Sequence, residues 1–239
     1  MRVPSPWLQP LDYDAVRPLV PTDLPALPKP PDDGLLARKP VAECGDSLLC
    51  LPDDLQRRHA YLELRSPRMP KQMYSRGQVI ERLRAAEETL PEPFHLLILD
   101  TWRTVDAQRE LTRIYSNYTS DLCASYVADA DNPQVPAPHT TGAAVDLTLS
   151  IDGKGLPMGA DFDEFGPAAH FLQLEDLAAD ADPSLVLARD LRRLLAHTML
   201  AQGFAPIFSE WWHFSYGDQR WAVFYDEPHA RYDIVNVDN

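Results

Sequence analysis

Four side chains of the types that bind and assist metal ions stand in two short motifs of the sequence. The first motif contains His139 and Asp146, and the second contains Glu210 and His213. Two imidazoles and one carboxylate form a common ligand set of catalytic zinc sites, in which the fourth position is left for water. A carboxylate three residues before the last histidine is well placed to activate that water. The pattern H-x(6)-D … E-x-x-H therefore predicts a zinc peptidase, with His139, Asp146 and His213 as ligands and Glu210 as general base.

Arg103 is a candidate for a further part of the same chemistry. A fixed cation usually complements the negative charge that develops on oxygen when water attacks a carbonyl. Arg103 closely follows the apolar run 94–99, which is typical of a buried strand. We consider two roles for it, namely stabilisation of that oxyanion or an ion pair with Asp100 or Asp106. The residues alone leave both roles open.

The aromatic neighbours of Glu210 bear on its acidity. Trp211 and Trp212 follow it directly, and they indicate a partly buried environment. Burial would raise the pKa of Glu210 towards neutrality, which suits a group that takes up and returns a proton. We expect the two tryptophans themselves to pack in the core rather than to contact a substrate.

Strands that could position the motifs are indicated by alternating hydrophobicity. Residues 144–151 alternate strictly between apolar and polar or small side chains, which predicts a strand with Asp146 on its polar face. His139 then lies in the loop that enters this strand, and a turn follows at Asp152. Glu210 and His213 would face opposite sides of a regular strand, so we expect the chain to kink or bulge between them.

Three helices are predicted by apolar spacing and by capping residues. Ser75 and Gln78 form a possible capping box for the first helix. The second helix is expected over 105–118, and the third should begin at Asp182 and end before Gly203. Helices beside short strands predict an α+β fold, in which a small mixed or antiparallel sheet is flanked by helices and carries the zinc site.

The N-terminal part of the chain has a different composition. Of the 23 prolines in the 239 residues, eleven lie within the first 52. Because proline interrupts helices and sheet ladders, we expect residues 1–54 to form an irregular extension that wraps a domain formed by 55–239. Apolar residues in the extension are expected to attach it to that domain, namely Trp7, Leu8, Tyr13, Val16, Leu19 and Val20.

Charge and cysteine content bear on the binding partners, the location and the disulfide bonds to be expected. The net charge of −14 argues against binding to nucleic acid or to anionic membranes. No apolar run is long enough to span a bilayer and no secretory signal is recognisable, so we expect a cytoplasmic protein. The three cysteines, Cys44, Cys50 and Cys123, do not suggest a disulfide framework, and buried free thiols are favoured over a Cys44–Cys50 bridge.

Taken together, these motifs resemble those of the zinc D-alanyl-D-alanine dipeptidases of the vancomycin-resistance type, a branch of the LAS metallopeptidases. That group carries S-x-H-x-x-G-x-A-x-D followed by E-x-x-H, and the sequence here reads A-P-H-T-T-G-A-A-V-D and E-W-W-H. The resemblance implies one Zn²⁺ per chain and a small dipeptide as substrate, in cell-wall precursor resistance or recycling. It implies no oligomeric state.

The resemblance also implies roles for two residues outside the ligand motifs. The segment D-T-W-R-T looks like the one that carries the transition-state arginine, which would make Arg103 the oxyanion stabiliser. Asp163, in P-M-G-A-D-F-D, resembles the aspartate that receives the ammonium group of the substrate. An ordinary turn-forming acid is the alternative for Asp163.

Three positions depart from the family pattern. Ala137 replaces a serine, Thr104 a proline and Trp102 a tyrosine, which leaves the preferred dipeptide open. Two alternative functions also remain at this stage. The first is a D,D-carboxypeptidase that acts on peptidoglycan stem peptides, and the second is a zinc-binding homologue without catalysis.

Overall fold

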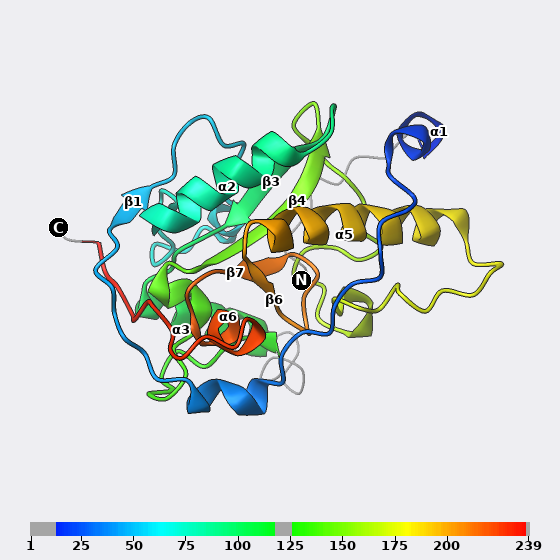
Figure 1. The fold of residues 1–239 in the computed structure, drawn as a ribbon. Helices are drawn as coiled ribbons and strands as arrows, with labels where there is room; N and C mark the ends of the chain where they lie inside the picture. Colours follow the sequence, from blue (N-terminus) through cyan, green and yellow to red (C-terminus); the bar gives the residue numbers. More distant parts are fainter. Residues whose placement is uncertain (1–12, 118–125, 238–239) are drawn as a thin grey trace.

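The computed structural model describes residues 13–117 and 126–237 and has an antiparallel sheet of five strands at its centre (Figure 1). The strand order is β3-β4-β7-β6, and β5 forms a hairpin with β4. β1 and β2 form a separate two-stranded sheet. The strands are β1 (Leu48–Cys50), β2 (Tyr74–Arg76), β3 (His95–Asp100), β4 (Ala144–Ile151), β5 (Lys154–Gly155), β6 (Ala205–Pro206) and β7 (His213–Ser215). The mixture of this sheet with helices confirms the predicted α+β class.

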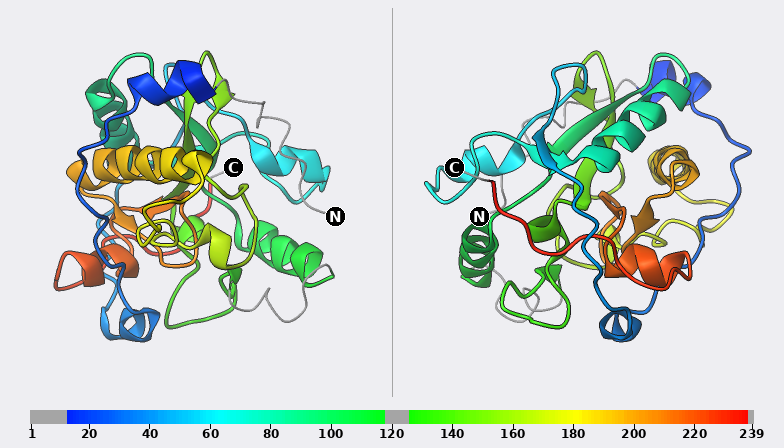
Figure 2. Two further views of the ribbon diagram at one scale, coloured as in Figure 1. Left: turned by 90° about the vertical axis from the view of Figure 1, so that its right-hand side faces the viewer. Right: turned by 60° about the vertical axis from the view of Figure 1, so that its left-hand side comes forward.

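Helices surround the sheet on both sides. In the described residues they are α1 (Tyr13–Val16), α2 (Gly77–Thr89), α3 (Val105–Ser116), α5 (Pro183–Ala201) and α6 (Gln219–Phe224). Short 3₁₀ turns are η1 (Arg17–Leu19), η2 (Asp33–Arg38), η3 (Ala60–Leu64), η4 (Pro138–Thr141) and η5 (Pro167–Ala169). α5 packs against α2, β4 and β6, while α3 lies on the other side of the sheet from α2 in all views (Figures 1 and 2).

The central strand β4 is covered on both faces. Val145, Leu147 and Leu149 are fully buried, as expected for the apolar face. The residues that alternate with them are buried as well, and Asp146 and Thr148 are each only 2% exposed. The polar face predicted from the alternation therefore lies inside the protein, where each charged group needs a partner or a ligand.

The ends of the helices test the capping predictions. Asp182 caps α5 by accepting a hydrogen bond from Ser184 N, and Gly203, with φ of +78°, follows its last turn, so both predictions are confirmed. The capping box at Ser75 is wrong. Ser75 Oγ donates to Gly142 O instead, and Asp46 Oδ2 accepts from Gln78 N at 3.0 Å. Asp46, just before β1, reaches this helix end because β1 pairs with β2.

The N-terminal segment runs around the outside of the molecule from α1 to β1 (blue in Figures 1 and 2). Val16 and Val20 are buried against the core, whereas Leu19 is exposed. Trp7 and Leu8 lie outside the described residues. The segment is less irregular than expected, because its last part forms β1 and pairs with β2. The division of the chain at residue 54 stays a prediction.

Two cysteines differ from expectation. Cys44 and Cys50 are free but exposed, so the prediction of buried thiols is wrong for both. They lie in the peripheral N-terminal segment, where little chain is available to cover them. Cys123 lies outside the described residues, as does Tyr118 at the predicted end of the second helix. No helix within 13–117 and 126–237 is long and apolar enough to cross a membrane.

Candidate active site

Three acidic and basic residues stand side by side across the sheet because of its strand register. Asp146 on β4 pairs with Asp100 on β3 and with His213 on β7. Directly opposed residues of neighbouring strands project from the same face of a sheet. The register therefore places Asp146 between Asp100 and His213.

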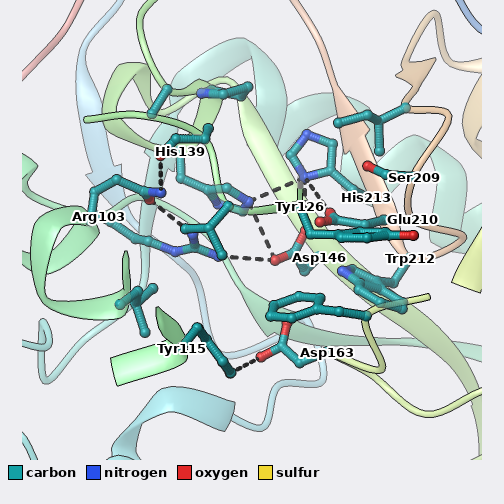
Figure 3. A pocket seen from close by; sticks show the side chains of 18 of the residues that line it. Arg103, Tyr115, Tyr126, His139, Asp146, Asp163, Ser209, Glu210, Trp212 and His213 are labelled. Carbon is teal, nitrogen blue, oxygen red and sulfur yellow. Dashed lines mark hydrogen bonds and ion pairs between the residues drawn. The ribbon is translucent and has the colours of Figure 1, made fainter. Parts of the chain in front are cut away.

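His139 reaches this row from η4, the turn that precedes β4. Its backbone carbonyl accepts a hydrogen bond from Arg103 N at 3.1 Å, and its Nδ1 donates to Thr101 O at 2.5 Å. This second bond leaves Nε2 as the free nitrogen, facing Asp146 and His213 (Figure 3). Gly142 allows the chain to turn from η4 into β4, because its φ is +75° and a Cβ there would lie 2.8 Å from Leu48 Cδ1.

His139, Asp146 and His213 form a compact cluster of possible metal ligands. One ligand atom from each lies within 4.8 Å of the other two, and all three residues are buried. His139 Nε2 lies 3.2 Å from His213 Nδ1, and Asp146 Oδ1 lies 3.0 Å from the same Nδ1. Two imidazoles and a carboxylate that turn these atoms towards one another fit a divalent cation of the zinc type.

The charge states of the cluster residues agree with binding of a divalent cation. Burial acts to raise the pKa of Asp146, but His139 and His213 outweigh it, so the pKa is lowered and the group stays an anion. Burial lowers the pKa of His213, which favours the neutral imidazole that a metal requires. His213 turns Nδ1 towards the cluster, and its Nε2 has no hydrogen-bond partner within the described part of the chain.

Glu210 stands beside the cluster, outside the regular part of β7. The chain bends through residues 207–212 before β7 begins at His213, which confirms the expected break between Glu210 and His213. Glu210 Oε2 lies 3.7 Å from His213 Nδ1, and its side chain is 12% exposed. Burial and the charges of Asp146 and Asp163 raise the pKa of Glu210 well above its usual value, in the direction predicted. A divalent cation in the cluster would act in the opposite direction.

Arg103 is held on the far side of Asp146 by several partners. Its Nε donates to Asp100 Oδ2 at 2.6 Å, and its Nη2 lies 3.2 Å from both Asp146 Oδ2 and Tyr61 OH. The ion pair with Asp100 considered from the sequence is therefore present. Burial acts to lower the pKa of Arg103, but Tyr61 and the two aspartates raise it, so the group remains a cation.

Asp163 enters the same pocket from the loop that follows β5. Tyr61 OH donates to its Oδ1 at 3.2 Å, and Tyr115 OH donates to its Oδ2 (Figure 3). Burial raises the pKa of Asp163 to about 7, and the charge of Asp146 acts in the same direction. The group is close to its titration point at neutral pH, and a cation nearby would stabilise its anion.

These residues line a single cavity of about 870 Å³, a volume that includes its opening to solvent. Trp211 and Trp212 are both buried in the core, as predicted, and Trp212 also lines the cavity. Tyr61, Asp33 and Tyr115 also line the cavity and were not predicted from the sequence as site residues. Arg220 was missed too. Neither spacing nor composition marks these four residues, because they meet only through the tertiary fold.

Comparisons with known proteins point to one family. A family model described as D-ala-D-ala dipeptidase matches residues 71–234. A D-alanyl-D-alanine dipeptidase of Synechocystis sp. is 28% identical over 229 residues, which cover 82% of this chain and 92% of the relative. A D-alanyl-D-alanine dipeptidase of Escherichia coli is 36% identical over 121 residues, which cover 50% of this chain and 53% of the relative.

Proposed function

Because the chain belongs to the D-ala-D-ala dipeptidase family of metallopeptidases, we propose that it hydrolyses the peptide bond of D-alanyl-D-alanine or a closely related D,D-dipeptide. One Zn²⁺ per chain is the proposed cofactor, held by His139, Asp146 and His213. The donor set supports zinc, since two imidazoles and one carboxylate are typical of catalytic zinc sites. A zinc ion bound there would lower the pKa of water and polarise the scissile carbonyl.

Glu210 is the proposed general base. Its carboxylate lies within 3.7 Å of a proposed ligand atom, which puts it next to any water in the open corner of the cluster. It would take a proton from the attacking water and return it to the departing amine. The raised pKa of Glu210 suits the second step, because the protonated acid must persist long enough to donate.

Arg103 and Asp163 are proposed to contact the dipeptide. Arg103 Nη2 lies beside Asp146 and can donate to an oxyanion that forms next to the cluster. Asp163 would receive the free ammonium group of the substrate, because its anion is stabilised by a neighbouring cation. The observation that carries the proposal is that Asp163 and the cluster line one cavity, as a dipeptidase requires.

The test pairs metal analysis with turnover. Purified protein should hold about one zinc per chain and hydrolyse D-alanyl-D-alanine faster than its L,L-isomer. Acetylation of the substrate's amine should abolish turnover, because the acetylated amine carries no charge for Asp163 to bind. Undiminished hydrolysis of the acetylated peptide would indicate a carboxypeptidase, and metal-loaded protein that cleaves none of these peptides would refute catalysis.

A further inference from the structure

Arg220 is a second arginine in the cavity, and the roles proposed above do not use it. It lies in the first turn of α6, is 5% exposed and lines the cavity. Its charge acts to lower the pKa of both Glu210 and His213, although burial keeps the pKa of Glu210 raised. Arg220 faces the same cavity as these two residues of the proposed reaction centre.

The hydrogen bonds of Arg220 are incomplete. Its Nη1 donates to Asp33 Oδ1. Its Nε is buried and has no partner, and Nη2 donates no hydrogen bond to the described residues. A guanidinium group has five N–H donors, and buried donors without acceptors cost free energy. The group is thus prepared for an acceptor that residues 13–117 and 126–237 do not supply.

Asp33, the present partner of Arg220, is poorly held. It begins η2 in the N-terminal segment, and its side chain is 65% exposed, against 5% for that of Arg220. An exposed carboxylate returns to water at little cost, whereas a buried guanidinium cannot be left unpaired. Replacement of Asp33 by another carboxylate would therefore keep the charge of Arg220 balanced.

A dipeptide brings such a carboxylate with it. Two arginines, Arg103 and Arg220, line the cavity, and Arg103 is already paired with Asp100 and Asp146. Resting on the proposed function, we infer that Arg220 binds the C-terminal carboxylate of the dipeptide and that Asp33 occupies this place until the substrate arrives. The enzyme should therefore select peptides that end in a free carboxylate directly after the scissile residue.

Two substrates that differ only at this group test the inference. D-alanyl-D-alanine has the carboxylate, and D-alanyl-D-alaninamide replaces it with a neutral amide. Arg220→Met should lower kcat/KM for the acid by about 10²-fold, mainly through KM, because a buried ion pair is lost. Turnover of the amide should change by less than about threefold. Arg220→Lys should recover part of the activity on the acid.

Asp33→Asn provides the matched control for a purely structural ion pair. If Arg220 only anchors the N-terminal segment, this variant should reproduce the loss seen in Arg220→Met. If Asp33 instead competes with the substrate, Asp33→Asn should leave KM for the acid unchanged or lower it. Equal losses on the acid and the amide in Arg220→Met would overturn the inference.

Direct binding separates this inference from the proposed function. Calorimetry on zinc-loaded Glu210→Gln should show tighter binding of the acid than of the amide, and Arg220→Met in that background should abolish the difference. Wild-type protein that binds the acid through Arg220 but does not cleave it would refute only the proposed function. An acid and an amide that bind equally well would refute only the role of Arg220.

Discussion

Asp146 and Asp163 lie at the two ends of the cavity, and their surroundings shift their pKa values in opposite directions. Asp146 lies beside Arg103 and two histidines, and the histidines lower its pKa despite burial. Asp163 receives hydrogen bonds from two tyrosine hydroxyls, and burial raises its pKa to about 7. Residue type alone therefore does not determine the charge state, which depends on whether cations or neutral donors surround the carboxylate.

A single side chain joins the two ends. Tyr61 OH accepts a hydrogen bond from Arg103 Nη2 and donates one to Asp163 Oδ1. The Asp146 end, which contains Arg103, and the Asp163 end are thus coupled through one buried hydroxyl. We expect substitutions at the Asp146 end to affect metal binding and chemistry, and substitutions at the Asp163 end to affect substrate binding and pH dependence.

Loss of a proposed ligand should have the largest effect. His139→Ala or His213→Ala should lower zinc content from about one per chain to near zero and reduce kcat/KM by on the order of 10⁴-fold or more. Elemental analysis and steady-state kinetics measure both. His197→Ala is the control, because its ring bonds Pro25 O on the surface. Full zinc content in either ligand variant would remove that histidine from the ligand set.

Glu210→Gln should have the second-largest effect on activity. The amide keeps the shape of the side chain but cannot accept the proton, so kcat should fall by about 10²–10⁴-fold while zinc content stays the same. Single-turnover kinetics on the zinc-loaded protein measure the step directly. A near-normal rate would reject the role of Glu210 as base.

Asp163→Asn should act on the opposite end, with a loss of about 10²-fold in kcat/KM that appears mainly in KM. In the wild type, the Asp163 anion forms as pH rises through about 7, so KM should fall between pH 6 and pH 8. The variant lacks this titrating carboxyl, and its KM should depend much less on pH in this range. A loss confined to kcat would contradict a role in binding the ammonium group.

The free energy of unfolding should also depend on pH, in a direction that the raised pKa of Asp163 determines. The pKa of Asp163 is about 7 in the folded protein, against an ordinary value of 3.8. Protonation therefore favours the folded state, and this stabilisation is lost as pH rises from about 4 to about 7, by about 1.4 kcal/mol per pH unit. Asp163→Asn should thus gain stability relative to wild type in melting experiments at pH 8 compared with pH 5. An equal difference at both pH values would show that Asp163 does not titrate in this range.

Tyr115→Phe should have the smallest effect. The hydroxyl of Tyr115 lowers the pKa of Asp163, in opposition to burial, so its removal should shift the KM–pH profile to higher pH and lower kcat/KM a few-fold at pH 7. Tyr74→Phe is the matched control, since that hydroxyl bonds Gln72 at the surface. Identical pH profiles for Tyr115→Phe and the control would place the titrating group elsewhere.

Much of the local structure could be predicted from the sequence. The strand that carries Asp146, the capped helix that starts after Asp182 and the break between Glu210 and His213 follow from periodicity and capping chemistry. The capping box at Ser75 failed because a distant residue, Asp46, supplies the helix end instead. Local rules hold where the partner is nearby in the chain and fail where a remote segment competes for the same group.

The sequence by itself determined which residues are able to bind a metal, because ligand type and motif spacing are local properties. Only the tertiary structure decided that Asp100, Asp146 and His213 lie side by side on neighbouring strands. Strand register depends on pairings between distant segments. The same holds for the charge of Asp163 and for the pairing of Arg220 with Asp33. Burial and neighbouring charges set these properties, and they arise only when remote parts of the chain are brought together.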